Sequence, residues 1–208
     1  MAIEYSTLAR EYKSEIIVKK SKFITSVSPV NTEKEAAAFV ERIRKQYWDA
    51  THNVYGFVIG DNDEIARFSD DGEPSGTAGK PVFEAIKMEK VKYSAVVVTR
   101  YFGGILLGAS GLIRAYGQAA HEGIRQAGIV TMKLYTPVLF SIDYGNVNKV
   151  QRYLESCGHF DAKFSYEDKV SVCVDILSTD IDRFFKDMTE LLLGNFFPTC
   201  GEEKYMAR

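Results

Sequence analysis

The chain of 208 residues contains few cysteines and no long apolar segment. Its three cysteines, Cys157, Cys173 and Cys200, are odd in number and widely spaced. This spacing excludes a disulfide framework and a zinc site built from cysteine pairs, and it is typical of a reducing compartment such as the cytoplasm. We expect Cys157 to lie in a core, because a free cysteine behaves as a small hydrophobic residue.

Membrane-directed segments are also absent from the sequence. No apolar run approaches the roughly 18 residues that a helix needs to cross a bilayer, and the first residues lack the uninterrupted apolar stretch of a signal peptide. We therefore expect a cytoplasmic protein with no membrane partner.

The chain has no strong excess of positive charge. Its net charge is −2; residues 1–135 carry 18 Lys and Arg against 16 Asp and Glu, whereas residues 136–208 carry 8 against 12. Because domains that bind nucleic acid usually show a strong positive excess, the composition does not demand such a partner. A local basic patch remains compatible with these totals.

The length suits two domains of roughly 100 residues each. In residues 136–208, apolar residues at alternate positions predict strands, and apolar residues at helical spacing predict two helices. The resulting order, βαββαβ, is the ferredoxin-like pattern. We place the boundary at Thr136-Pro137, giving an N-terminal domain of residues 1–135 and a C-terminal ferredoxin-like domain of residues 136–208.

The N-terminal domain mixes strands and helices, so the whole chain is predicted to be α+β. Two strands in residues 15–30 flank a basic turn at Lys19-Lys20. Thr32 and Glu35 form a capping box that predicts a helix. Further strands are predicted near residues 54–59, 65–68, 93–99 and 130–134, and further helices after Pro81 and after Gly108.

Residues 67–116 are the long stretch whose composition a folding argument explains least. A loop rich in Gly, Pro and carboxylates is followed by a buried strand, a glycine turn and a helix, whose first N–H groups attract anions. We therefore take this stretch, with the start of the strand at residue 52, as the binding surface. The candidate binding residues are His52, Asn53, Arg67, Asp70, Asp71, Glu73, Ser75, Thr77, Lys80, Arg100, Tyr101, Phe102, Gly103, Gly104 and Arg114.

Several of these residues have two open interpretations. The carboxylates of the loop either accept backbone N–H bonds as turn formers or present an acidic edge to a partner or a metal. Arg100 and Arg114 either converge on an anion or form ion pairs with the acidic loop, whose carboxylates are Asp70, Asp71 and Glu73. Tyr101-Phe102 either stacks on bases or packs in a core.

Known nucleotide-binding motifs do not fit the glycines. A P-loop needs Gly where Pro74 stands and Ser or Thr where Pro81 follows Lys80, and the glycines after residue 102 lack dinucleotide-fold spacing. No G-x-S-x-G elbow or metal-ligand spacing is present. We expect no catalytic residue, no metal and no cofactor. The alternative is a small hydrolase or peptidase-like enzyme that uses His52 and the Asp70-Asp71 loop.

Two motifs closely resemble those of the YigZ/IMPACT family. The first is residues 69–81, and the second is Arg100-Tyr-Phe-Gly-Gly104 with the glycine-led segment up to Tyr116; Thr51-His52-Asn53 also fits. The resemblance covers roughly residues 15–130, and the C-terminal domain is similar to that of bacterial members. It departs from the family pattern at Leu106, where members often carry Lys, and at Ser110, where Gly is expected; the loss of a positive charge at Leu106 weakens phosphate binding.

The resemblance implies a two-layer α+β N-terminal domain like domain IV of elongation factor G, and a C-terminal domain like the last domain of that factor. It implies no established catalytic residue. Eukaryotic members regulate translation during amino-acid starvation by binding a large activator of the responsible kinase. We therefore predict a translation-associated regulator that binds RNA, the ribosome or a ribosome-associated protein through the surface from Arg67 to Tyr116.

Overall fold

The computed structural model describes residues 3–207. They divide into an N-terminal unit, Tyr5–Thr131, and a C-terminal unit, which consists of the residues from Met132 onward together with the few residues before Tyr5. Strand β7 (Ile129–Ile142) belongs to both units. The sequence predicts two strands here, but the structure has one, because Thr136 and Pro137 both pair with β9. The predicted domain boundary after residue 135 lies within this strand.

The N-terminal unit contains a five-stranded sheet in which all neighbouring strands are antiparallel. Its strand order is β2 (Tyr12–Val18), β3 (Ser21–Pro29), β6 (Ser94–Tyr101), β4 (His52–Ile59) and β5 (Ile65–Ser69). The helices are α1 (Glu33–Gln46), α2 (Gly79–Met88) and α3 (Ala109–Ala127). β1 (Glu4–Leu8) pairs with β7 instead.

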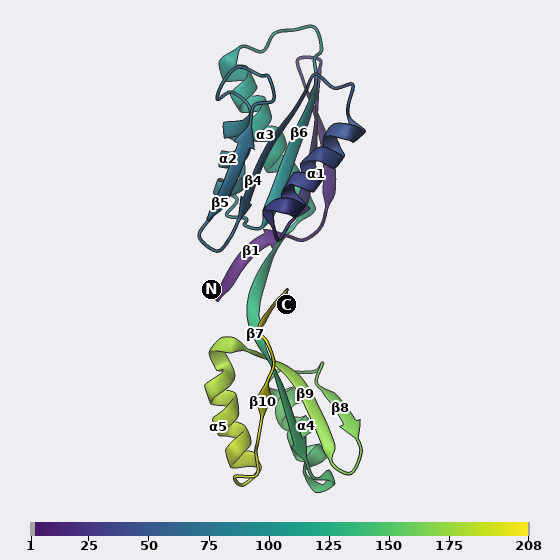
Figure 1. Cartoon of the computed structure of the whole chain (residues 1–208), viewed down its shortest axis with the longest axis vertical. Helices are drawn as coiled ribbons and strands as arrows, with labels where there is room; N and C mark the ends of the chain where they lie inside the picture. The colour runs from purple at the N-terminus through teal and green to yellow at the C-terminus, as the bar shows by residue number, and fades with distance from the viewer. Residues whose placement is uncertain (1–2, 208) are drawn as a thin grey trace. The chain divides into compact units, whose positions relative to one another are not determined.

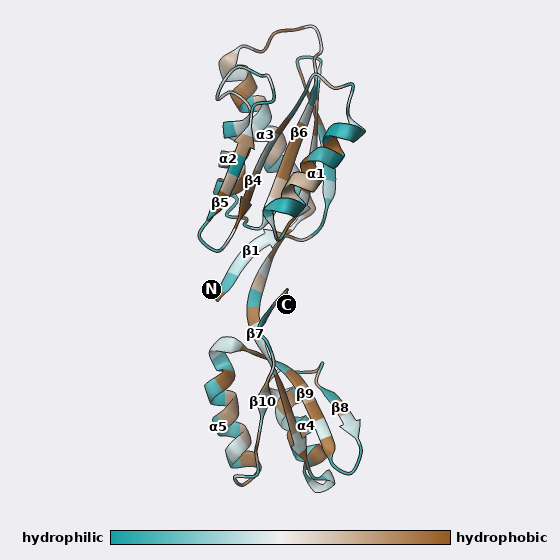
Figure 2. Cartoon of the chain, in the orientation of Figure 1, coloured by the Kyte–Doolittle hydropathy of each residue, from teal (hydrophilic) through white to brown (hydrophobic). Residues whose placement is uncertain are grey.

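Helices cover both faces of this sheet (Figure 1). Along β6, Val96 and Val98 share a core with α2 and α3, whereas Ala95 and Val97 share a core with α1. Burial on both faces explains why β6 is a continuous apolar run, as its hydrophobic colouring in Figure 2 shows. The α+β class is confirmed, and α1 adds a third layer to the expected two.

Local sequence signals fix the ends of several elements. The N–H of Glu35 donates to Oγ1 of Thr32 at 3.2 Å, and the N–H of Asn31 donates to the Glu35 carboxylate at 2.8 Å, which confirms the predicted cap of α1. Lys19 and Lys20 have φ values of 45° and 66° in the predicted basic turn between β2 and β3. The chain therefore reverses tightly at this end of the sheet.

The C-terminal unit confirms the predicted ferredoxin-like pattern. After β7 come α4 (Val147–Ser156), β8 (Lys163–Tyr166), β9 (Val170–Leu177), α5 (Ile181–Leu191), β10 (Thr199–Cys200) and β11 (Lys204–Ala207). Short 3₁₀ turns, Tyr144–Asn146 and Ser178–Asp180, precede α4 and α5. The last strand is split, and both parts pair with β7, so the antiparallel order is β10 or β11, β7, β9, β8. Residues of α4 and α5 share one core with β7 and β9.

The prediction that Cys157 lies in this core was wrong. Its side chain is exposed. Although Cys157 follows the buried Leu154 at helical spacing, α4 ends at Ser156. The chain then turns away through Gly158, which has a φ of 82°.

Candidate functional site

Asp70 holds the loop between β5 and α2 from inside. One carboxylate oxygen accepts the N–H groups of Ala78 and Gly79 at 3.0 and 2.8 Å, and the other accepts the N–H of Gly76 at 2.8 Å. The cap residue of α2 itself, Ala78, has no side chain that can accept these N–H groups. Asp70 therefore acts as a remote N-cap. Burial opposes the charged form, but the three N–H bonds outweigh it, and the pKa of Asp70 is lowered. For this residue the turn-former interpretation is confirmed.

Asp71 fastens the same loop to the start of β4. Its carboxylate accepts the N–H of Asn53 at 2.6 Å and a guanidinium N–H of Arg44 at 2.8 Å. Its backbone carbonyl lies 2.8 Å from Nδ1 of His52. Because a carbonyl oxygen only accepts, Nδ1 carries the proton. Nε2 of His52 then faces Glu73, whose Oε1 lies 3.8 Å away.

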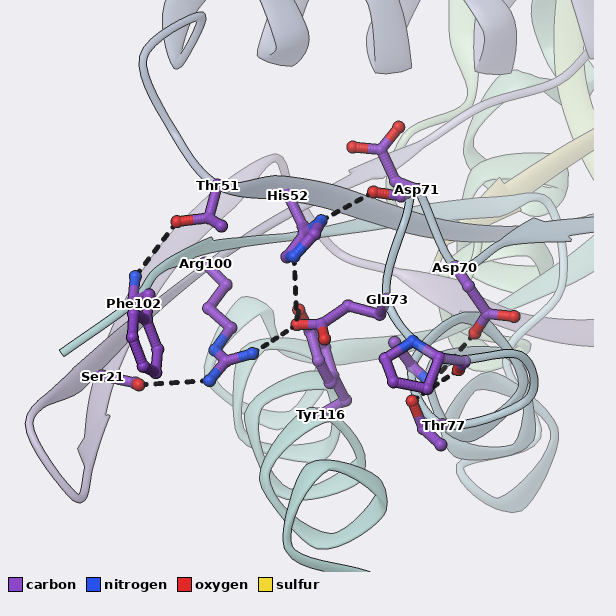
Figure 3. Close-up of polar contacts among 12 residues, drawn as sticks. Ser21, Thr51, His52, Asp70, Asp71, Glu73, Thr77, Arg100, Phe102 and Tyr116 are labelled. Atoms are coloured by element: carbon purple, nitrogen blue, oxygen red, sulfur yellow. Dashed lines mark hydrogen bonds and ion pairs between the residues drawn. The ribbon is translucent and has the colours of Figure 1, made fainter. Parts of the chain in front are cut away.

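Glu73, Arg100 and Tyr116 form a buried polar cluster behind this loop (Figure 3). Their residues are 8%, 5% and 0% exposed, respectively. Oε1 of Glu73 accepts Nη1 of Arg100 at 2.6 Å and the hydroxyl of Tyr116 at 2.7 Å. Nη2 of Arg100 donates to Oγ of Ser21 at 3.4 Å. The loop, β6 and α3 therefore meet at one carboxylate oxygen.

The ion pair between Glu73 and Arg100 stabilises the folded state. Removing one member of a buried ion pair typically costs about 3–5 kcal/mol, because the other charge is left without compensation. The Arg100 guanidinium also lies between two aromatic rings, with Cζ 5.6 Å from the ring centre of Phe23 and 5.5 Å from that of Phe102. Burial, and then the bond to Glu73, raise the pKa of Tyr116, so its hydroxyl stays a donor. Of the two interpretations for Arg100, the ion pair with the acidic loop is the one observed.

β6 leaves this cluster through a glycine turn that leads to α3. A Cβ on Gly103 would lie 2.1 Å from the backbone of Lys20, so a larger residue does not fit beside the β2–β3 turn. The N–H of Gly103 donates to Oγ of Ser21 at 3.2 Å. Gly104 has a φ of 81°, a left-handed conformation that favours glycine. The glycine turn therefore brings the end of β6 against the β2–β3 turn before the chain enters α3.

A cavity of about 410 Å³ opens between the acidic loop and the glycine turn. His52, Glu73 and Arg100 contribute its charged and titratable groups. Most of its other lining is apolar, and the apolar side chains come from Pro74, Phe102, Leu106, Leu107, Ala109 and Leu112. An apolar cavity with a few oriented polar groups is the usual form of a binding site.

The predicted basic residues do not gather at this cavity. Arg67 lies exposed on β5, 3.4 Å from Glu33 of α1. Lys80 is exposed and faces a carboxylate of its own helix at 3.9 Å. Arg114 is exposed, and its Nε donates to a backbone carbonyl one turn earlier in α3 at 3.3 Å. Arg100 is buried, so the two arginines do not converge on one anion.

Of three other candidates, Thr77 and Tyr101 make local hydrogen bonds. Ser75 is exposed, and the hydroxyl of Thr77 donates to the carbonyl of Pro74 at 2.6 Å. The hydroxyl of Tyr101 donates to the carboxylate of Asp49 at 2.8 Å. Burial, followed by this bond to a carboxylate, raises the pKa of Tyr101 to about 12. Tyr101 therefore ties β6 to the segment before β4.

Tyr116 of the cluster and Ser21, which accepts a hydrogen bond from Arg100, were not among the predicted site residues. In the sequence, Tyr116 follows the helical spacing of the other apolar residues of α3. Its hydroxyl is the signal that points to the cluster, because a buried tyrosine usually has a hydrogen-bond partner. Ser21 carries no such signal, since its role depends on the approach of Gly103 from a distant part of the chain.

The arrangement does not favour the hydrolase alternative. Nδ1 of His52 donates to a backbone carbonyl rather than to a carboxylate, and Asp70 is occupied by backbone N–H groups.

Within residues 3–207, no three His, Cys, Asp or Glu side chains are grouped as metal ligands. Over the same range, no helix combines the length and apolarity that crossing a bilayer needs.

Comparison with known proteins places this site in a family. The model of the Impact N-terminal domain matches residues 19–124, which include the acidic loop, the glycine turn and most of α3. "IMPACT family member YvyE" of Bacillus subtilis (strain 168) is 41% identical over the whole of this chain and 96% of its own length. "IMPACT family member YigZ" of Escherichia coli (strain K12) is 32% identical over 89% of this chain and 92% of its own length.

Other similarities are more limited or concern structure. The human protein named "Protein IMPACT" is 33% identical over 43% of this chain and 29% of its own length. A crystal structure of a hypothetical protein superposes with a TM-score of 0.63, at 30% identity, over 97% of this chain and 99% of that one. The family model covers half of the chain, and the bacterial relatives match over most of both chains. The chain therefore belongs to the IMPACT family.

Proposed function

We propose that this chain is a cytoplasmic, translation-associated binding protein whose partner at the N-terminal unit is a ribosome-associated protein. The link to translation comes from the family, whose eukaryotic members regulate translation. The cytoplasmic location is supported by three free, exposed cysteines, which are compatible with a reducing compartment. The site itself supports the choice of a protein as the partner.

The apolar rim of the cavity is the observation that carries this choice. Leu106 is 84% exposed and Phe102 is 45% exposed, and both line the cavity; Ile105, which precedes Leu106 in the turn before α3, is 40% exposed. Exposed apolar groups gathered around a cavity mark interaction sites, because a partner gains free energy by removing them from water. Aromatic residues such as Phe102 are enriched at protein interfaces.

RNA matches this surface less well. The chain contains no Lys or Arg between Tyr101 and Ile113, and the charge of Arg100 is compensated by Glu73. Contacts from Lys and Arg to phosphates supply most of the affinity of non-specific nucleic-acid binding. Lys19 and Lys20 of the adjacent β2–β3 turn are exposed and could contact phosphates. An experiment therefore has to distinguish an RNA partner from a protein partner.

Site-specific photo-crosslinking tests this function. A photoreactive amino acid is placed at Leu106, and at Leu193 as the control, because Leu193 is 87% exposed but lies in the C-terminal unit. Each variant is irradiated with ribosomes purified together with their associated factors, and the adducts are identified. We expect a protein adduct from position 106 that is absent from position 193.

The same pair of positions provides a binding measurement. Leu106→Ser is expected to lower co-sedimentation with ribosomes about ten-fold or more, while Leu193→Ser leaves it unchanged. An adduct with ribosomal RNA at position 106 would overturn the assignment of a protein partner. Equal adducts from both positions, or none from position 106, would overturn the use of this surface.

A further inference from the structure

The cavity beside the glycine turn is also suited to one particular chemical group. We propose that it binds the C-terminus of a polypeptide, with the carboxylate at the start of α3 and the last apolar side chain in the cavity. The inference rests on the proposed function, since it specifies which part of a protein partner enters the site.

The two helices on this face of the sheet begin differently. The start of α2 is occupied by the carboxylate of Asp70. At α3 the cap residue is Gly108, which has no side chain to accept an N–H, and the first intrahelical bond runs from Leu112 N–H to Gly108 O at 2.9 Å. The N–H groups of residues 109–111 precede that bond. Gly108 and Ala109 line the cavity, so the positive end of a 19-residue helix faces it.

Arg100 provides a second, independent observation. It is 5% exposed and lines the same cavity, and its Nε is buried without a hydrogen-bond partner among residues 3–207. Its Nη groups are already bonded to Glu73 and Ser21. Unsatisfied buried donors are uncommon in folded proteins. The half-exposed ring of Phe102 lies over the guanidinium, and both residues line the cavity.

The charges around the cavity suit a single negative charge. Glu73 is the one carboxylate of the lining; Arg100 compensates its charge, and Tyr116 donates a hydrogen bond to it. No lysine lines the cavity, so a phosphate would find no free ammonium group for its second charge. A carboxylate needs only N–H donors, and capture of a C-terminal carboxylate by backbone N–H groups is a known recognition mode.

The walls and the volume favour an apolar last residue. Leu106, Leu107 and Leu112 surround the space next to the start of α3. The volume of about 410 Å³ lies near the lower end of the range of roughly 300–1,000 Å³ for ligand sites. It therefore holds about one or two residues, which is the end of a chain rather than its middle.

A matched pair of peptides tests the proposal. Acetyl-Gly-Ser-Gly-Leu with a free carboxylate and the same peptide with a C-terminal amide are titrated into the ¹⁵N-labelled full chain. We expect the acid to shift the amide signals of residues 109–111 and to bind about ten-fold more tightly than the amide. Equal affinity of acid and amide would overturn the proposal.

A backbone substitution identifies the donors. Ala109→Pro removes one N–H at the first helical position, where proline is tolerated, and the ψ of 166° at Gly108 suits a residue before proline. Ala109→Ser keeps the N–H and serves as the control. We expect the preference for the acid to fall in Ala109→Pro and to persist in Ala109→Ser. An undiminished preference in folded Ala109→Pro would place the carboxylate elsewhere and overturn the assignment.

The crosslinking result separates this proposal from the function on which it rests. A protein adduct at position 106 combined with equal affinity for acid and amide overturns only the carboxylate site. A preference for the acid without any protein adduct overturns the protein partner, and it assigns the cavity to small carboxylates instead.

Discussion

The two units bury different kinds of residues. Among the described residues, all the buried polar and charged side chains except Thr136 belong to the N-terminal unit: Thr7, Ser14, Ser21, Thr25, Ser26, Asn53, Glu73, Thr77, Ser94, Thr99 and Arg100. The core of the C-terminal unit is built from aliphatic and aromatic side chains and Met188. An apolar core needs only the right pattern and volume, whereas each buried polar group needs a partner in the right place.

This difference indicates where the chain is specialised. Burying charged groups costs free energy, and the two charged members of this set, Glu73 and Arg100, both line the cavity, so their place there requires an explanation beyond folding. In the C-terminal unit, the described core has no comparable requirement. Substitutions should therefore have their largest and most specific effects in the N-terminal cluster.

The largest expected effect is at the buried ion pair. Glu73→Leu or Arg100→Met alone should lower the free energy of unfolding by about 3–5 kcal/mol, because each leaves one buried charge without compensation. The double variant should lose less than the sum of the two, since both charges are removed. Urea unfolding followed by circular dichroism measures all three variants.

An exposed ion pair of the C-terminal unit provides the control. Arg183 is 3.9 Å from Asp187, and its side chain is 87% exposed. Arg183→Met should change the free energy of unfolding by no more than about 0.5 kcal/mol. If the three N-terminal variants were as mild as this control, the cluster would contribute nothing to stability, and its role would lie in binding alone.

Sequence patterns predicted the C-terminal unit nearly completely. Alternation and helical spacing suffice there, because every core position is apolar and each element follows the previous one along the chain. The errors concern places where an element continues or stops. β7 continues through Thr136-Pro137, and α4 stops before Cys157. Tertiary contacts decide such ends, so local patterns do not reveal them.

The candidate site was predicted in its location but not in its connections. Composition singled out residues 67–116, and the acidic loop and the glycine turn do meet there. The sequence did not indicate which carboxylate pairs with Arg100, because Asp70, Asp71 and Glu73 lie in the same loop and no local pattern distinguishes them. The structure distinguishes them: Asp70 caps α2, Asp71 fastens β4, and Glu73 is buried with Arg100.

The glycines give the next largest expected effect. Gly103→Ala should cost about 3 kcal/mol, because the new Cβ would lie 2.1 Å from the backbone of Lys20 and one of the two backbone segments would have to shift. Gly104→Ala should cost about 1 kcal/mol, since its φ is left-handed but the space around it is open. Thermal unfolding of both variants measures this difference.

Gly158 of the C-terminal unit is the matched control for the glycine variants. It has a φ of 82° and open space, as Gly104 has, so Gly158→Ala should behave like Gly104→Ala. A Gly103→Ala variant no less stable than these two would mean that the β2–β3 turn moves easily away from residue 103. The glycine turn would then not be held in place by its contact with that turn.

The effect expected at Asp70 is smaller than those at the buried ion pair and at Gly103, and it depends on pH. Asp70→Asn places an amide where a carboxylate oxygen accepts a backbone N–H, so at pH 7 we expect a loss of about 1–2 kcal/mol. The control is Asp168→Asn at an exposed turn of the C-terminal unit, where we expect a change within about 0.5 kcal/mol. Urea unfolding at a series of pH values measures both variants against the parent chain.

The sign of the pH dependence follows from the lowered pKa of Asp70. A carboxylate with a lower pKa in the folded state stabilises that state above its ordinary pKa of about 4, and the contribution is lost as the pH falls through the folded value. The difference between the parent chain and Asp70→Asn should therefore be constant from pH 7 to about 5 and shrink below about 4. A difference that stayed constant down to pH 3, or grew, would show that the charge of Asp70 does not hold the start of α2.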